Sequence, residues 1–113
     1  MKIVIPTNGK RGLDDTVAEH FGRCQYFVIA EIEKKKIVKT EAIENTSFDK
    51  MGGAGISTAQ AIAEKDVKAV ITGNVGPRAS DVLRQFKIEV YSGSGTIKEV
   101  LQKFIENKLE KIQ

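Results

Sequence analysis

The chain has 113 residues, of which 41% are hydrophobic and 29% charged, and its 18 Lys+Arg and 15 Asp+Glu give a net charge of +3. This length suits one domain over residues 1–113, and the apolar fraction excludes an intrinsically disordered chain. No apolar run approaches the roughly 18 residues of a membrane span, and Pro6 interrupts the first one before a signal-peptide core could form. We therefore expect a cytoplasmic protein with no membrane partner.

The composition also argues against nucleic acid as a partner. The two signs of charge are interspersed, Trp is absent, and only 6% of the residues are aromatic, which leaves few platforms for stacked bases. The one basic run, Lys34–Lys36, falls where a hairpin turn is expected. The abundance of Lys and Glu, with Ile more frequent than Leu, is typical of a thermophile.

The first half of the chain predicts three strands. Residues 2–6 form a short β-branched run that ends in a polar loop. A short helical turn capped by Asp14 or Asp15 is expected through Val17, Ala18 and Phe21, with Gly22 just past its end. Residues 24–33 and 37–44 then predict an antiparallel hairpin.

The second half predicts alternating helices and strands. After the glycine-rich residues 51–55, the spacing of Ser57 and Gln60 indicates a capping box at the start of a helix. Strands are expected at 68–72 and 88–91. Pro77 suits the first position of the helix between them, whose buried stripe is predicted to be Ala79, Val82, Leu83 and Phe86. Thr96 and Glu99 indicate a second capping box, at the start of the last helix, whose predicted buried residues are Ile97, Val100, Leu101, Phe104 and Ile105.

Helical connections of this kind impose parallel pairing on the later strands, while the hairpin adds antiparallel neighbours. The predicted fold class is therefore α/β, with a mixed five-stranded sheet in the order 3-2-1-4-5, one antiparallel strand, and helices on both faces. The loops at 7–12, 73–76 and 92–95 would leave strands at the carboxyl edge of this sheet, where open α/β folds bind ligands.

Several of these loops run into helix N-termini, whose exposed N–H groups attract anions. The same holds for the loop at 52–55. Taken singly, each glycine is explained equally well by a tight turn. Taken together, the loops indicate an anionic ligand, and the candidate contacts are Asn8, Gly52, Gly53, Gly55, Gly73, Asn74 and Gly76.

Familiar enzyme motifs are absent. The sequence has no GxxxxGK[ST] loop, no GxGxxG loop after a strand, and no GxSxG elbow. The first strand carries no acidic residue, which argues against a two-metal nuclease. The chain is therefore not expected to be an enzyme.

The segment from His20 to Cys24 places an imidazole and a thiol four positions apart. Both groups bind zinc, copper(I) or an iron–sulfur unit, although a helix-capping histidine and a buried cysteine explain the pair as well. Cys24 is the only cysteine, so disulfides and CxxC sites are excluded. Two ligands are too few for a bare ion but suffice for a preassembled anionic cluster. Arg11, Arg23, Lys10 and Arg78 could balance its charge.

These features resemble the dinitrogenase iron-molybdenum cofactor biosynthesis family over nearly the whole chain. The resemblance rests on residues 2–6, on Val17 and His20–Arg23 running into Tyr26–Phe27, on the glycine-rich approach to the first long helix, and on Val70–Gly73 followed by Gly76. The His-Phe-Gly-Arg string before an aromatic strand is its most specific element.

The resemblance implies a ribonuclease-H-like fold and a non-catalytic, nitrogenase accessory-like role: binding or carriage of an iron–sulfur or iron–molybdenum cluster or its precursor. It makes His20 the leading cofactor contact and metal ligand. Cys24, the other candidate ligand, stands where many relatives have a small residue such as alanine. The loop at 52–55 lacks the histidine that relatives often carry there. Metallocluster assembly or acceptor proteins are the implied partners, and a monomer or weak homodimer is expected. The alternative is a metal-free module that holds an anionic metabolite or an acidic partner segment at the glycine-rich loops.

Overall fold

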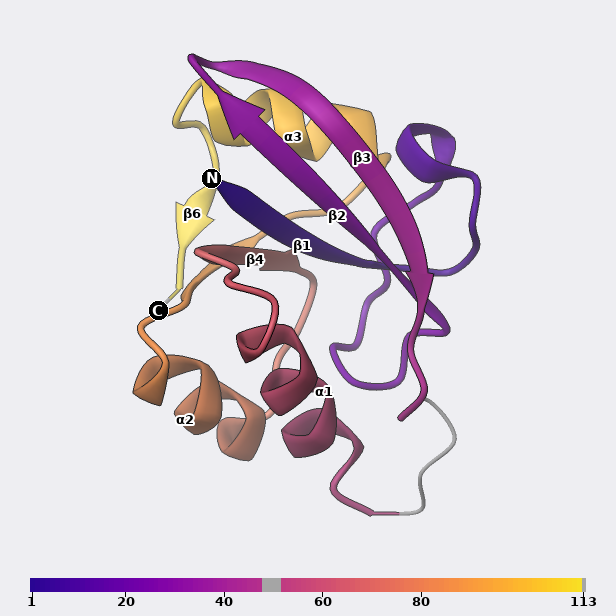
Figure 1. The fold of residues 1–113 in the computed structure, drawn as a ribbon, viewed down its shortest axis with the longest axis vertical. Coiled ribbons are helices and arrows are strands. Elements are labelled where there is room, and N and C mark those ends of the chain that lie inside the picture. Colours follow the sequence, from indigo (N-terminus) through magenta and orange to yellow (C-terminus); the bar gives the residue numbers. More distant parts are fainter. Residues whose placement is uncertain (48–51, 113) are drawn as a thin grey trace.

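A computed structural model describes residues 1–47 and 52–112 (Figure 1). Its elements, in chain order, are the strand β1 (Lys2–Thr7), the short 3-10 helix η1 (Gly12–Asp14), the strands β2 (Tyr26–Glu33) and β3 (Lys36–Glu44), the helix α1 (Ala54–Ala63), the strand β4 (Ala69–Thr72), the helix α2 (Pro77–Gln85), the strand β5 (Glu89–Ser92), the helix α3 (Ile97–Ile105) and the strand β6 (Glu110–Lys111).

The strands form one mixed sheet in the order β3-β2-β1-β4-β5-β6. β1 pairs parallel with β4, and β4 parallel with β5, whereas the β1–β2 and β2–β3 pairs are antiparallel. This confirms the predicted strand order and class. The additional strand, β6, pairs antiparallel with β5 through only two residues, Glu110 and Lys111, which are both exposed and leave no hydrophobic pattern in the sequence.

The alternation of side chains along β1 builds two cores. Val4 faces α1 and α2 and belongs to a cluster that includes Ala59 and Leu83, whereas Ile3 and Ile5 face α3 and belong to a cluster that includes Leu101. All six side chains are almost completely buried. The helices therefore cover both faces of the sheet, as predicted, with α1 and α2 on one side and α3 on the other (Figure 1).

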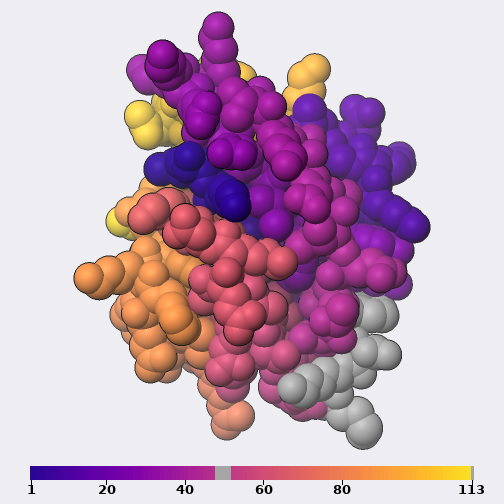
Figure 2. Space-filling model, viewed as in Figure 1, coloured from indigo at the N-terminus to yellow at the C-terminus, as the bar shows by residue number. Residues whose placement is uncertain are grey.

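The space-filling view shows the α1–α2 face from outside (Figure 2). The indigo start of the chain lies between two surfaces. Below it are the orange surface of α2 and the adjoining rose surface, which includes α1. Above it is the magenta surface of the β2–β3 hairpin. Among the described residues, no helix has both the length and the apolar character needed to cross a membrane.

The segment between β1 and β2 is not the predicted helical turn. Only Gly12–Asp14 is helical, and the backbone at Asp15 is extended. The hydrogen bonds of this segment run instead to other loops and to β1: the Ala18 N–H donates to Pro6, and the Val17 N–H donates to Gly95. The prediction was wrong because these long-range partners cannot be read from local spacing.

The helix starts were predicted with mixed success. Thr96 and Glu99 form the expected capping box of α3, and Pro77 occupies the first turn of α2. The capping box at Ser57 is wrong, because α1 begins three residues earlier, at Ala54, and the Ser57 hydroxyl instead contacts the Ser47 hydroxyl at 2.7 Å. Phe86 is also not in the buried stripe of α2, since its side chain is 57% exposed.

Candidate functional site: a cleft between two helix N-termini

An open cleft of about 370 Å³ lies between the N-termini of α1 and α2. We call it the arginine cleft because two arginines, Arg23 and Arg78, contribute to its lining. Its other lining residues are Phe21, Gly53, Ala54, Gly55, Ile56, Gly76, Pro77 and Ala79. Two cationic side chains therefore share one hollow with the amino ends of two helices.

A glycine directly precedes each of the two helices whose N-termini open onto the arginine cleft. Gly53 precedes α1 with a φ of 71°, a left-handed conformation that glycine adopts without strain, and Gly76 precedes α2 in an extended conformation. In the described part of the chain, neither helix has a side-chain cap. Pro77 has no N–H, but the other first-turn N–H groups have no partner within their own helix and, in the described part of the chain, are available to solvent or to an anion.

The loop that carries His20 is fixed by backbone contacts. The Asn74 N–H donates to the Glu19 carbonyl at 2.7 Å, and the Phe21 N–H donates to the Asn74 carbonyl at 2.9 Å. Gly73 packs so closely on Glu19 that an added Cβ would lie 2.8 Å from its carbonyl oxygen. These contacts hold the loop against the end of β4, and His20 itself is exposed.

A buried asparagine fixes the other end of this loop. The Asn45 side-chain amide donates to the carbonyls of Cys24, at 2.9 Å, and Gly22, at 3.3 Å. Its side-chain oxygen accepts from the Ser47 N–H and from the Thr58 hydroxyl on α1. Asn45 thereby joins the loop, the end of β3 and α1. Sequence analysis missed it, because a lone asparagine after a strand reads as a turn residue.

Cys24 belongs to the core cluster that includes Val4 and is not among the residues that line the arginine cleft. The side chain is 2% exposed, and burial raises the pKa of its thiol from 9.0 to about 11. Because the thiolate is the metal-binding form, this environment disfavours a ligand role at neutral pH. Of the two roles that the sequence left open for Cys24, the geometry supports packing.

The predicted site residues do not all meet at this cleft. Arg23, Gly53, Gly55 and Gly76 line it, and Gly52 is adjacent to Gly53 in the chain, whereas Gly73 and Asn74 line a different cleft. Asn8 and Arg11 lie near η1: the Asn8 amide donates to the Thr16 hydroxyl at 3.3 Å, and the Arg11 guanidinium is 3.9 Å from the carboxylate of buried Asp15. Lys10 lies over the Tyr26 ring, at 5.7 Å from its centroid.

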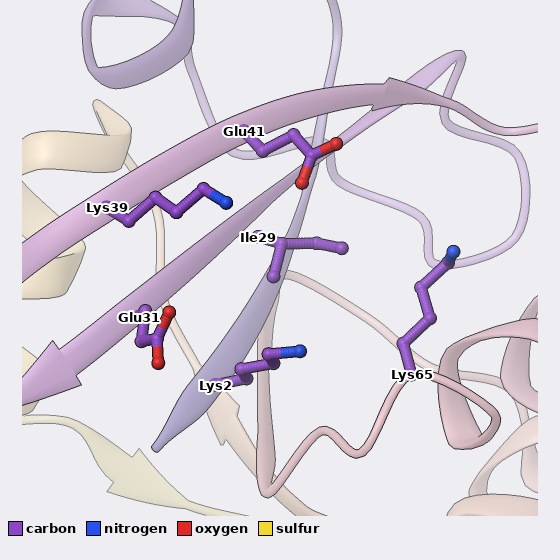
Figure 3. Close-up of a pocket in the computed structure, with 6 residues that line it drawn as sticks. All are labelled: Lys2, Ile29, Glu31, Lys39, Glu41 and Lys65. Carbon is purple, nitrogen blue, oxygen red and sulfur yellow. The ribbon is translucent and has the colours of Figure 1, made fainter.

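A further hollow of about 250 Å³ lies on the surface formed by β1, β2 and β3, next to the end of α1 (Figure 3). It contains none of the predicted site residues. Three lysines and two glutamates surround a single apolar side chain there: Lys2, Lys39, Lys65, Glu31, Glu41 and Ile29. The near balance of charge makes this hollow a poorer anion site than the arginine cleft.

Metal-ligating side chains are not clustered in the described part of the chain. Within residues 1–47 and 52–112, no group of three or more His, Cys, Asp or Glu side chains is arranged to hold a metal ion. A bare cation would therefore lack a ligand set in this part of the chain. A preassembled cluster differs from a bare cation in that it is anionic and needs only one or two protein ligands.

Comparison with known proteins places the chain in a family. Residues 1–107 match the family model described as "Dinitrogenase iron-molybdenum cofactor". Uncharacterized protein MJ0580 of Methanocaldococcus jannaschii is 42% identical over 114 residues, which cover 100% of this chain and 92% of the relative.

Solved structures agree with the family match. The apo form of the orange protein from Desulfovibrio gigas is 30% identical with a TM-score of 0.88, and the match covers 97% of this chain and 91% of that one. A Thermotoga protein provisionally assigned as NifB is 33% identical with a TM-score of 0.82, covering 98% and 92%. The chain therefore belongs to the dinitrogenase iron-molybdenum cofactor family.

Proposed function

We propose that this protein binds and carries an anionic metallocluster, of iron–sulfur or iron–molybdenum type, or its precursor, and that it does so without catalysis. The arginine cleft is the proposed binding place, and the convergence of two uncapped helix N-termini with Arg23 and Arg78 is the observation that carries the proposal. The family description and the apo state named for the orange protein support it.

The proposed binding combines charge with one ligand bond. N–H groups at the two helix starts and the two guanidinium groups neutralise the cluster, and partial desolvation in the cleft strengthens these interactions relative to water. His20, adjacent in the chain to the lining residue Phe21, supplies the imidazole that would ligate iron or molybdenum. Cys24 has no part in this proposal because its thiol is buried.

A single imidazole gives a bond that an acceptor protein can displace. Tight enclosure by three or four protein ligands would suit a permanent cofactor, whereas one ligand at an open cleft suits delivery. The partners are accordingly proposed to be proteins that assemble the cluster or receive it.

The test is cluster uptake by protein reconstituted anaerobically with iron and sulfide. The double variant Arg23→Gln/Arg78→Gln should bind the cluster about tenfold or more weakly than the wild type, equivalent to at least about 1.4 kcal/mol. Arg11→Gln is the matched control, because Arg11 lies near η1 beside Asp15 and outside the lining of the cleft. Equal uptake by all three proteins, wild type included, would refute the cleft as the binding place.

A further inference from the structure

A second cleft, of about 500 Å³, lies where β4 and β5 end. It is lined by Gly73 and Asn74, which follow β4, and by Ser92–Ser94 at the end of β5. Lys103 of α3 and the segment Lys108–Glu110 also line it. This is the carboxyl edge of a parallel strand pair, the position at which open α/β sheets bind small ligands. We call it the serine cleft.

The serine cleft is separate from the arginine cleft, since the two share no lining residue among those described. It was also not recognised from the sequence as a unit. Gly73 and Asn74 belong to the glycine-rich loops that the sequence indicates, whereas Lys103 and Lys108 lie beyond the loop at 92–95, in the last helix and after it.

Of the side-chain donors of the cleft, Lys108 forms an ion pair with Glu106 at 3.1 Å, and the others are unengaged in the described part of the chain. Lys103 takes part in no ion pair shorter than 4 Å there, and the hydroxyls of Ser92 and Ser94 and the Asn74 amide form no side-chain hydrogen bond. The Ser94 N–H likewise donates to no backbone carbonyl of these residues. Such a concentration of free donors around one cationic side chain favours an oxyanion.

The cleft also contains acceptors. Glu19 and Glu110 contribute to its lining, and their carboxylates can accept hydrogen bonds but cannot donate them. Two lysines and two glutamates together suit a ligand with an anionic end and a hydroxyl-bearing end. A simple inorganic anion would leave the carboxylates opposed to its charge.

We propose that the serine cleft binds a small organic oxyanion that also carries hydroxyl groups, such as a phosphate ester or a hydroxycarboxylate. Lys103, Ser94 and Asn74 hold the anionic group, and Glu19 and Glu110 accept from the hydroxyls. This second site does not depend on the proposed cluster carriage.

The serine cleft is connected to the His20 loop through backbone. Asn74 and Glu19 both line the cleft, and the Asn74 N–H donates the 2.7 Å hydrogen bond described above to the Glu19 carbonyl, while the Asn74 carbonyl accepts from the Phe21 N–H. A ligand that contacts the Asn74 side chain therefore acts on the residue that anchors His20. Binding in the serine cleft is expected to shift the amide resonances of the His20 loop as well.

The test is a titration of ¹⁵N-labelled, cluster-free protein with sn-glycerol 3-phosphate, followed by amide chemical shifts. The expected result is a saturable shift at Asn74, Ser94 and Lys103 with a Kd of about 1 mM or lower. Glycerol and sodium chloride at matched concentrations should give no saturable shift. Absence of saturation, or shifts centred on Gly53–Gly55 in the arginine cleft, would overturn the proposal.

Paired variants on one helix sharpen the test. Lys103→Gln should weaken binding about fivefold or more, whereas Lys98→Gln, an exposed lysine of α3 that does not line the cleft, should leave the Kd unchanged. The amide spectrum of each variant reports at once whether it is folded. Equal affinity in the two variants would contradict the assigned role of Lys103 and the proposal with it.

Discussion

Gly22 and Gly55 touch backbone to backbone: a Cβ added to Gly22 would lie 2.7 Å from the Gly55 Cα and 2.9 Å from its nitrogen. This contact seats the loop of His20 and Arg23 on the first turn of α1. Gly55 approaches α2 in turn, since an added Cβ there would be 3.2 Å from the Ala79 Cβ. The geometry of the arginine cleft thus depends on small residues that let three segments meet.

Replacing Gly22 is expected to be strongly destabilising. Gly22→Ala must both adopt a φ of +96° and push against the backbone of α1, so we expect a loss of about 3 kcal/mol or more in the free energy of unfolding. Gly12→Ala is the matched control, because Gly12 has a φ of +64° but no atom near its added Cβ. It should cost only about 1 kcal/mol. Equal losses by urea denaturation would show that the Gly22–Gly55 contact contributes nothing.

The buried side-chain amide of Asn45 is expected to contribute more to the free energy of unfolding than an exposed amide does. Asn45→Ala leaves the Gly22 and Cys24 carbonyls and the Ser47 N–H without their partner, which should cost about 2–4 kcal/mol. Asn8→Ala removes one long, exposed hydrogen bond to Thr16 and should cost less than about 0.5 kcal/mol. Thermal or urea unfolding of both variants checks the difference, and comparable losses would argue against the Asn45 network.

The buried thiol predicts a specific loss of stability at alkaline pH. Burial raises the pKa of Cys24 from 9.0 to about 11. Below pH 9 the thiol is neutral in both states, so the full stability is present. Above pH 9 the unfolded chain ionises first, and the wild type should lose about 2 kcal/mol by pH 11.

Cys24→Ala isolates this effect from other alkaline titrations. The variant should lack that part of the decline, and its stability curve between pH 9 and 11 should be flatter than that of the wild type. Cluster uptake by Cys24→Ala should equal that of the wild type. Parallel pH curves would show that the thiol is not desolvated, and lost uptake would restore Cys24 as a ligand.

The sheet order and both layers of helices were predictable, because β-branched runs and the helical periodicity at Ala79 and Leu83 are local signals. The segment from Asp15 to Gly22 was not, since its hydrogen bonds go to Pro6, Gly95 and Asn74. A turn-forming sequence that is stabilised by distant carbonyls has no local pattern.

Only part of the candidate site could be predicted, because some of its residues carry local signals and others are brought there by long-range contacts. Glycines before α1 and α2 mark helix starts, so Gly53 and Gly76 could be found from sequence, as could Arg23 beside His20. Whether Gly73 shares their cleft depends on how the loops cross the sheet edge, and the structure places it in the serine cleft. The Asn45 contacts with Gly22 and Cys24 join residues more than twenty positions apart and leave no motif.

The most direct test of cluster carriage detects the His20 imidazole on the metal. His20 is the only histidine of the chain, so ¹⁵N-histidine labelling marks one side chain. Pulsed electron paramagnetic resonance of the anaerobically loaded, reduced protein should show nitrogen coupling to the cluster that changes on labelling and disappears in His20→Ala, with binding weakened about tenfold. A cluster held with full affinity and no histidine coupling would contradict the account.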